Sequence, residues 1–315
     1  MKQVEERDMH NTTDVIVIGG GPAGCAAAAY LARCKWKVSV VDRQQDGGFL
    51  GSLGNVSYYP GFPEAISGTE LIKRMRRQAE LVGAHIASDC AKSIEVGEGP
   101  LKVATDSGKL LEAQSIVIAT GAAARTNYLH NEREFMGRGV SHDAIADGPA
   151  VAKRSAAVIG KTRQAAEEAL ALARFAEKIH FIIPSSKLEI EEGLLKQLQQ
   201  HRSVEMHFST SLKKINGADH VNSVTVFSNG QEKELPVACV FTYVHEYQST
   251  TGFLGSAVEM GGNGAVKVDQ NLSTSARGVF ACGDVICARP QLPAISSAQG
   301  LLAGISVDRY LSSRG

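Results

Sequence analysis

The stretch that decides the fold is DVIVIGGGPAGCAAAAYLARCKWKVSVVDR, residues 14–43. Its first β-branched run predicts a strand buried on both faces in a parallel sheet. Gly19, Gly21 and Gly24 follow with the G-x-G-x-x-G spacing, which permits a tight turn, a close approach of backbone to pyrophosphate, and close helix–strand packing. An alanine-rich helix comes next, whose N-terminus attracts phosphate, and the second strand ends on Asp42, whose carboxylate can bind a ribose hydroxyl. This order of elements favours a dinucleotide site over an ordinary βαβ turn.

Length and composition limit the remaining possibilities. The 315 residues suffice for two domains with separate cores, and the formal net charge of zero gives no indication of a nucleic acid or an anionic membrane as partner. No apolar run is long enough to span a membrane, and residues 1–13 are polar, so we expect a disordered leader rather than a signal peptide. Six cysteines without dense spacing favour a reducing compartment. We therefore expect a soluble cytoplasmic protein.

The pattern of the opening stretch returns in the middle of the chain. Residues 155–183 read strand, helix, strand, so the sequence predicts an α/β fold with two Rossmann-like, three-layer units. Residues 47–62 are rich in glycine and aromatic side chains, and we expect them to be irregular and to lie over a ligand. The other predicted elements are helices at 67–83, 163–176, 194–200 and 297–311, a buried strand at 115–121, and short antiparallel strands near 85–86, 91–96, 101–105 and 109–113.

The chain is similar to a known family. It resembles the low-molecular-weight thioredoxin reductases from residue 14 nearly to its end, through VIVIGGGPAG, YYPGFPEAISGTEL, IVIATGA, GRGVS, AAEEALALAR and GVFACGDV. The resemblance implies a homodimeric flavoprotein, in which residues 14–123 and 250–315 form a discontinuous FAD-binding domain around an NADPH-domain-like unit, residues 124–249. In this family electrons pass from NADPH through FAD and a C-x-x-C disulfide to thioredoxin.

Most positions that match the family's FAD site are retained. The resemblance assigns cofactor contacts to Gly19, Gly21, Pro22, Ala23, Gly24, Asp42, Arg43, Gly48, Leu50, Tyr58, Ala119, Thr120, Gly121, Gly283, Asp284 and Ala294. Asp284 is expected to contact the ribityl–phosphate part of the cofactor, with a helix cap as the alternative interpretation. Phe49 and Tyr58 replace a glutamine and an asparagine of the family, which predicts a more aromatic flavin environment.

The redox-active cysteine pair of the family is absent from its usual place. Asp143 and Ala146 stand at the two cysteine positions after GRGVS, so this segment has no thiols for dithiol–disulfide exchange. Asp147 matches the family's proton donor, but without thiols to serve, a turn or cap residue is the favoured interpretation. His142 and Asp143 can act as acid–base groups toward another substrate, and an exposed polar turn is the alternative that we favour.

The second nucleotide motif has also changed. Thr162 replaces the glycine that brings backbone against pyrophosphate, and its β-branched side chain would crowd that approach. Pro184, Ser185 and Glu189 replace the basic residues that read a 2′-phosphate, which removes charge-assisted contacts. No acid ends this strand in their place, so a change to NAD is not indicated either. We therefore expect this unit not to bind NADPH.

Three further groups of residues each have two interpretations. Cys282 and Cys287 flank the Gly-Asp pair, and are either a relocated redox pair or structural cysteines, the interpretation that we favour. Cys25 lies in the first turn after the glycines, where the helix dipole can lower a thiol pKa, but a packing role is favoured. Lys161 and Arg163 either bind an anion at the altered second turn or are solvated.

The sequence thus predicts a flavoprotein oxidoreductase with FAD as its cofactor, which neither uses NADPH nor reduces thioredoxin through a C-x-x-C. The expected partners are a second copy of the chain and a redox protein or small-molecule acceptor, without nucleic acid or membrane. Catalytic residues are not assigned, and no metal site is predicted. One alternative is a non-catalytic FAD-binding regulatory dimer. Another is an NAD(P)H-dependent thioredoxin or disulfide reductase with an atypical site.

Overall fold

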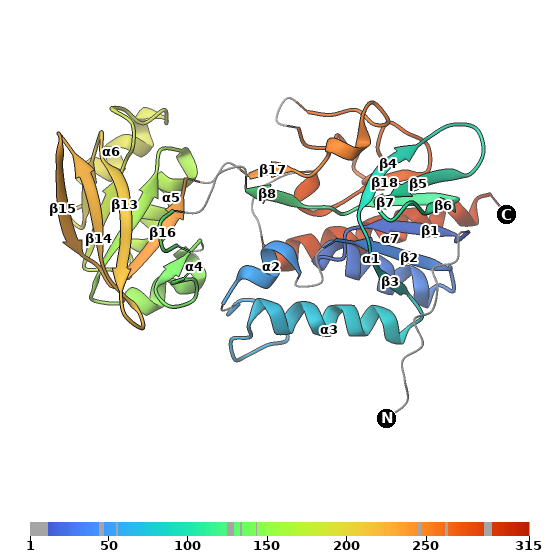
Figure 1. Ribbon diagram of the computed structural model, residues 1–315, viewed down its shortest axis with the longest axis horizontal. Helices are drawn as coiled ribbons and strands as arrows, with labels where there is room; N and C mark the ends of the chain where they lie inside the picture. The colour runs from blue at the N-terminus through green and yellow to red at the C-terminus, as the bar shows by residue number, and fades with distance from the viewer. Residues whose placement is uncertain are drawn as a thin grey trace.

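The chain folds into two lobes of similar construction. The computed structural model describes residues 12–43, 47–54, 56–124, 129–132, 134–142, 144–244, 247–261, 264–286 and 292–314. Figure 1 shows the lobes side by side, one built from the two ends of the chain and the other from its middle. Each lobe contains a five-stranded sheet and a separate three-stranded sheet. The α/β fold with two Rossmann-like units is confirmed.

The five-stranded sheet of the first lobe is parallel throughout. Its strands lie in the order β18 (Val279–Ala281), β7 (Ser115–Ile118), β1 (Val15–Ile18), β2 (Val38–Asp42) and β3 (His85–Ser88). In β1, Val15 and Val17 belong to one apolar core, and Ile16 and Ile18 belong to another on the opposite face. The β-branched run is therefore a strand covered on both sides, as its sequence predicts.

Helices cover one face of this sheet and an antiparallel sheet covers the other, which gives the three layers (Figure 1). The helices are α1 (Pro22–Arg33), α3 (Gly68–Leu81) and α7 (Pro293–Ser312), and the antiparallel strands are β4 (Ala91–Glu95), β5 (Leu101–Thr105) and β6 (Leu110–Ala113). α1 and α7 pack very closely. A Cβ added at Gly300 would lie 2.0 Å from the carbonyl oxygen of Ala23, so only glycine permits this contact.

The second lobe repeats the arrangement with different strands. Its parallel sheet has the order β12 (Val204–His207), β11 (Lys178–Ile182), β10 (Ser155–Gly160), β16 (Cys239–Tyr243) and β9 (Val140–Ser141). The remaining elements are helices α4 (Ala144–Asp147), α5 (Arg163–Leu172) and α6 (Glu192–Gln200) and the antiparallel strands β13 (Ser211–Gly217), β14 (Val221–Ser228) and β15 (Gln231–Pro236).

The chain passes from one lobe to the other through a two-stranded antiparallel sheet. It consists of β8 (Ala122–Ala124) and β17 (Tyr247–Ser249), with Ala124 opposite Tyr247 and Ala122 opposite Ser249. The domain limits proposed from the sequence fall inside this sheet. It lies on the side of the first lobe that faces the second lobe in Figure 1, and we call it the neck below.

Several elements differ from those that the sequence predicts. β3 pairs with β2 in parallel, although a short antiparallel strand was expected near residue 85. Helix α2 (Gly48–Ser52) interrupts the segment expected to be irregular. α7 begins at Pro293, four residues before the predicted start, because proline is favoured in the first turn of a helix. α5 ends at Leu172, four residues before the predicted end.

The predicted disordered leader is too long by two residues. Thr12 forms a bridge with Glu112, and the buried Thr13 donates a hydrogen bond from Oγ1 to the carbonyl oxygen of Lys37 at 2.6 Å. Residues 1–11 lie outside the described part of the chain. Among the described residues, none of the helices is both long and apolar enough to cross a membrane.

Candidate functional site

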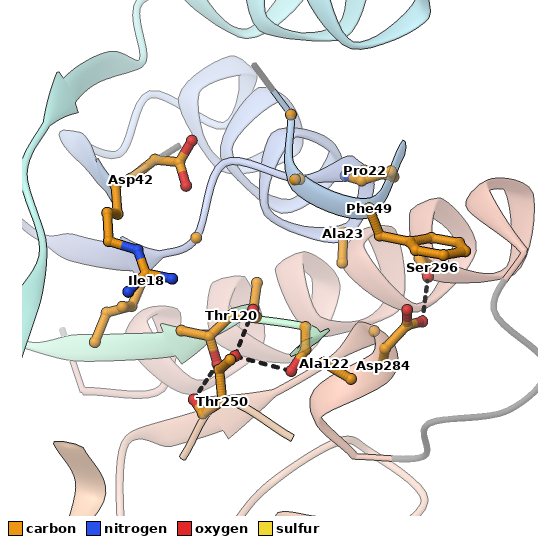
Figure 2. A pocket seen from close by; sticks show the side chains of 18 of the residues that line it. Ile18, Pro22, Ala23, Asp42, Phe49, Thr120, Ala122, Thr250, Asp284 and Ser296 are labelled. Carbon is orange, nitrogen blue, oxygen red and sulfur yellow. Dashed lines mark hydrogen bonds between the residues drawn. The ribbon is translucent and has the colours of Figure 1, made fainter. Parts of the chain in front are cut away.

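A cavity of about 420 Å³ lies at the carboxyl ends of β1, β2, β7 and β18 (Figure 2). From β1 the chain runs to β2 on one side, and the later β7 lies on the other, so this is where the strand order reverses. Open parallel sheets bind ligands at such a point. Many of the residues assigned from the sequence line the cavity, namely Gly19, Gly21, Pro22, Ala23, Asp42, Arg43, Gly48, Leu50, Ala119, Thr120, Gly121, Gly283 and Asp284.

The glycine turn offers free backbone to a ligand. Gly21 is the N-cap of α1 and has no side chain that could accept a hydrogen bond from the first turn. The first turn of α1 contains no acidic residue either. A Cβ added at Gly21 would meet no protein atom within 4 Å, whereas one added at Gly24 would lie 1.8 Å from the Gly19 carbonyl oxygen. Gly21 thus faces open space and Gly24 serves packing, which is the geometry that a pyrophosphate needs at a helix N-terminus.

At the far end of β2 the predicted ribose acid is held by an arginine. Asp42 pairs with the guanidinium of Arg76, whose Nε also donates to the Gly20 carbonyl oxygen at 3.3 Å. Both side chains of the pair are 13% exposed. Arg76 comes from α3, and sequence reasoning missed it. Arg76 follows the buried Ile72 by four residues, so the helical spacing places it on the same inward face of α3. This spacing could have indicated Arg76 from the sequence.

Asp89 is a second acid at this end of the cavity that the sequence did not suggest. Its carboxylate accepts hydrogen bonds from Ser107 Oγ at 2.5 Å and from the Cys90 backbone N–H at 2.8 Å. Burial by itself raises the pKa of Asp89, but these hydrogen bonds, with a contribution from Thr105, outweigh it and hold the pKa below its usual value. The group is therefore charged at neutral pH.

The opposite end of the cavity is more apolar. Phe49 and Pro293 line the cavity there, and in Figure 2 the Phe49 ring lies on the side of Asp284 and Ser296. Ser296 Oγ donates to Asp284 Oδ1 at 3.1 Å, which ties the end of the central sheet to the first turn of α7. Asp284 lies within a short 3-10 helix (Gly283–Val285) whose N-cap is Cys282, so it is not the cap residue itself.

Two threonines join the cavity to the neck. Thr120 Oγ1 donates to the Thr250 carbonyl oxygen at 2.9 Å, and Thr250 Oγ1 donates to the Thr120 carbonyl oxygen at 2.6 Å. Both residues line the cavity, as Figure 2 shows. A ligand here would therefore contact the two chain segments, next to β8 and β17, that connect the first lobe to the second.

Three of the assigned residues do not line the cavity. Gly24 packs against Gly19 instead. Tyr58 and Ala294 are not among the lining residues, although Pro293 and Ser296 in the first turn of α7 are. Further lining residues were not assigned as cofactor contacts, although two of them, Gly47 and Phe49, belong to the segment expected to lie over a ligand. These further residues are Ile18, Val41, Gly47, Phe49, Asp89, Cys90, Ala91, Ala122, Thr250, Gly252, Phe253, Leu292, Pro293 and Ser296.

The segment that replaces the cysteine pair is partly buried. His142 was expected in an exposed turn, but its side chain is only 7% exposed and that of Glu132 is fully buried. His142 Nδ1 lies 2.9 Å from Thr242 Oγ1, whose hydroxyl donates to Glu132, and His142 Nε2 lies 3.7 Å from the same carboxylate. The exposed-turn interpretation of His142 is wrong. Asp143 lies outside the described residues.

Asp147 has a structural contact in this segment. It ends α4 and accepts a hydrogen bond from Ser141 Oγ at 2.6 Å. Its side chain makes no capping hydrogen bond to the 3-10 helix that follows. This fits the interpretation as a turn residue, with Ser141 as the group that holds it. The side chain of Ala146 lies outside the described part of the structure.

The turn after β10 differs from the glycine turn after β1. Thr162 is the N-cap of α5, and its side-chain oxygen accepts the Ala165 backbone N–H at 3.4 Å. Arg163 pairs with Glu167 and Glu191, so its charge is already shared with two carboxylates. Pro184 and Glu189, at the positions of the family's basic residues, are exposed.

The buried thiols are poor nucleophiles. Burial raises the pKa of Cys282 to about 12, and the side chain is fully buried. Burial likewise raises the pKa of Cys25 to about 12, against the lowering by the nearby Arg76, and its Sγ donates to the Gly20 carbonyl oxygen. Both therefore fit packing roles. Cys287 lies outside the described residues, and Cys282 is free.

Comparisons with known proteins identify the family to which this chain is similar. The sequence profile of the pyridine nucleotide-disulphide oxidoreductases matches residues 13–300. The chain is 35% identical over 303 residues to a thioredoxin reductase of Aquifex aeolicus, with 96% of this chain and 94% of that protein covered. The crystal structure of a thioredoxin reductase from Streptococcus pyogenes superposes with a TM-score of 0.91 at 29% identity, covering 97% of this chain and all of that one.

Proposed function

Because the chain belongs to the pyridine nucleotide-disulphide oxidoreductase family, as a thioredoxin-reductase-like flavoprotein, we propose that it is an FAD-dependent oxidoreductase. In contrast to what the family name implies, we propose that its electron donor is not NADPH. One observation carries the proposal. Gly21 leaves open space at the N-terminus of α1, whereas the Thr162 side chain occupies the corresponding N-cap of α5. The first turn can take a pyrophosphate, and the second has lost the glycine that would allow it.

The residues around the cavity fit FAD. The glycine turn and the N-terminus of α1 would hold the pyrophosphate, and Asp42, oriented by Arg76, would bind the adenosine ribose. Asp284 and the apolar end around Phe49 would take the ribityl chain and the ring system. When bound, FAD supplies the transfer of electrons. The chain's own part is to position it, to exclude water with Phe49 and Phe253, and to choose the partner.

Two sequence features support a departure from thioredoxin reduction. The chain has no C-x-x-C, so electrons would leave the cofactor by a route other than a thiol pair in the second lobe. The strand after α5 carries no basic residues at the positions that would bind a 2′-phosphate. The acceptor would be a redox protein or a small molecule that reaches the cavity.

We further infer a cytoplasmic homodimer. α7 exposes the large apolar side chains of Ile295, Leu301 and Leu302, at 38%, 45% and 54%. Its buried residues, among them Gly300 and Val307, already pack inside the lobe. A second copy of the chain would cover the exposed side chains of this helix.

An anaerobic spectral titration tests the proposal. The purified protein should show the visible spectrum of oxidised flavin, which dithionite bleaches and which NADPH or NADH at equal concentration leaves unchanged for minutes. A thioredoxin reductase with an intact C-x-x-C, titrated in the same cell, is the positive control. Fast bleaching by NADPH would overturn the account of the second lobe.

Turnover separates an oxidoreductase from a flavin-binding regulatory protein. Reduced ferredoxin and reduced free flavin should each be offered as donor, with oxygen, quinone and disulfide compounds as acceptors. Multiple turnovers with any such pair support the proposal. A protein that binds FAD but is reduced only once, and passes electrons to no acceptor, would be the regulatory alternative.

A further inference from the structure

Three potential metal ligands converge on the second lobe, away from the cavity. They are His180 on β11 and Glu205 and His207 on β12, and one ligand atom from each lies within 4.8 Å of the others. His180 is buried, His207 is 18% exposed and Glu205 is 47% exposed. Nothing in the FAD chemistry proposed above uses these residues.

The sheet geometry explains why the three side chains meet. In the parallel pairing of β11 with β12, His180 lies in register with Glu205, and His207 follows two residues later on the same face. The neighbours Ile179 and Phe181 belong to the core on the helical side, so His180 lies on the other face, where Ile182 joins the core beneath β13–β15. β12 is the edge strand of its sheet, which leaves this group accessible from one side.

The distances are close to those within a zinc site. His180 Nδ1 lies 3.1 Å from His207 Nε2, at hydrogen-bond distance. His180 Nδ1 lies 3.7 Å from Glu205 Oε2, and His207 Nε2 lies 3.6 Å from Glu205 Oε1. Ligands that bind one zinc ion tetrahedrally at about 2.0–2.2 Å lie roughly 3.3–3.6 Å apart. Small shifts of the two rings and a rotation of the Glu205 carboxylate would bring both nitrogens and one carboxylate oxygen onto one ion.

One neighbour competes for the site. Lys178 Nζ lies 2.6 Å from Glu205 Oε2, and its side chain is 47% exposed. A cation would have to displace this ammonium group, which can turn into solvent because an exposed ion pair contributes little stability. Lys233 on the facing sheet adds a further positive charge near both imidazoles. The neighbours thus lower the affinity without blocking the ligand atoms.

We propose that His180, Glu205 and His207 bind one divalent transition-metal ion of the zinc class. Two imidazoles and one carboxylate are a ligand set that zinc accepts, and three protein ligands leave a position for water or an external ligand. The ion would join the edge strand β12 to β11. This inference is independent of the proposed electron donor and of the flavin.

Calorimetric titration of the purified holoprotein with zinc chloride tests the proposal. We expect one equivalent to bind with a dissociation constant in the micromolar range or below, and His207→Gln to weaken the binding at least tenfold. Glu205→Gln should also weaken it, because the carboxylate is the third ligand. His220→Gln is the matched control, since His220 is an exposed histidine of the same lobe, and its affinity should equal that of the wild type.

Copper provides a second readout that does not depend on folding stability. The electron paramagnetic resonance spectrum of the protein with one equivalent of Cu²⁺ should show coupling to two nitrogen nuclei, and that of His207→Gln to one. Absence of saturable zinc binding would overturn the proposal. So would equal zinc affinity of the wild type and His207→Gln, or a copper spectrum that the substitution leaves unchanged.

Discussion

At the scale of single residues, one glycine and one threonine distinguish two turns that otherwise have the same place in their sheets. Gly21 lies where a side chain would project into open space, and Thr162 lies where its own oxygen accepts a helix N–H. A phosphate needs the free N–H groups of the first turn, and at the second it would have to replace the threonine contact. The difference between the two lobes therefore begins with a side chain, not with the fold.

Substitutions at two glycines should separate binding from folding. Gly21→Ala places a methyl group where only the cofactor would be, and the backbone φ of −77° suits alanine, so we expect normal folding but FAD binding at least tenfold weaker. Gly24→Ala should instead unfold the apoprotein at lower temperature, because its Cβ would collide with Gly19. Thermal denaturation of the apoproteins and fluorescence titration with FAD measure the two effects.

Gly193→Ala in α6 serves as the control, since a Cβ there meets nothing within 4 Å; it should leave FAD binding unchanged and should not lower the unfolding temperature, because alanine favours a helix over glycine. If Gly21→Ala bound FAD like the wild type, the pyrophosphate could not lie where we place it.

The buried thiols should make the protein sensitive to alkali. The pKa of Cys282 is raised to about 12 in the folded protein, from 9.0 for an unperturbed thiol, so the unfolded chain releases this proton first. Stability is therefore complete below pH 9 and falls as the pH rises toward 12, by up to about 1.4 kcal/mol per pH unit. Urea unfolding measures the difference in free energy of unfolding between the wild type and Cys282→Ala. This difference should be smaller at pH 10.5 than at pH 8 by about 2 kcal/mol, because only the wild type loses stability as the thiol of the unfolded chain ionises.

Cys34 provides the comparison for this experiment, because it is exposed and its replacement leaves the buried thiol of Cys282 in place. Cys34→Ala should run parallel to the wild type at every pH. A constant difference between wild type and Cys282→Ala would show that the Cys282 proton is released equally in both states.

At the scale of elements, the N-terminus of α5 depends on the residue that has replaced the glycine. The Thr162 cap is long, at 3.4 Å, so Thr162→Ala should lower the free energy of unfolding by about 0.5–1 kcal/mol, and Thr162→Ser by less. Chemical denaturation measures this. An unchanged or higher stability of Thr162→Ala would mean that the hydroxyl does not cap the helix. We also expect Thr162→Gly to remain unreactive toward NADPH, because Pro184 and Glu189 stay in place.

Local sequence predicts some elements of this chain well and others poorly. The run at β1 is predictable because four buried apolar residues between polar flanks leave few alternatives. The orientation of β3 is not, because a strand of three half-buried residues and one exposed residue has no pattern that tells a parallel from an antiparallel neighbour. The start of α7 was placed four residues late, although Pro293 was a usable signal.

The candidate site divides in the same way. Its glycine turn and Gly-Asp pair are short motifs with a fixed backbone, and sequence suffices for them. The Asp42–Arg76 pair joins residues 34 apart, and Glu132 meets Thr242 across 110 residues. Such contacts depend on how the sheets and helices pack against one another. The spacing of residues in the sequence does not predict this packing. The cluster of His180, Glu205 and His207 was missed for this reason.

At the scale of the whole molecule, the exposed leucines of α7 carry the prediction of a dimer. Replacing Leu301 and Leu302 by lysine removes the apolar surface that a second copy would cover, and we expect sedimentation to change from the dimer to the monomer. Leu110→Lys, which alters a leucine on β6 that is 46% exposed, should remain dimeric. A wild-type protein that sediments as a monomer at micromolar concentration would contradict the prediction.

The neck has a consequence for how such a molecule can be divided. Ala124 and Tyr247 are opposite one another, so the entry and exit of the whole second lobe are neighbours. Deleting residues 125–246 and joining the two strands with Asn-Gly should close a β-hairpin in their place. We expect the remaining chain to fold and to keep the yellow colour of a flavoprotein. The second lobe would then be an inserted domain, and the first lobe would fold and bind the cofactor without it.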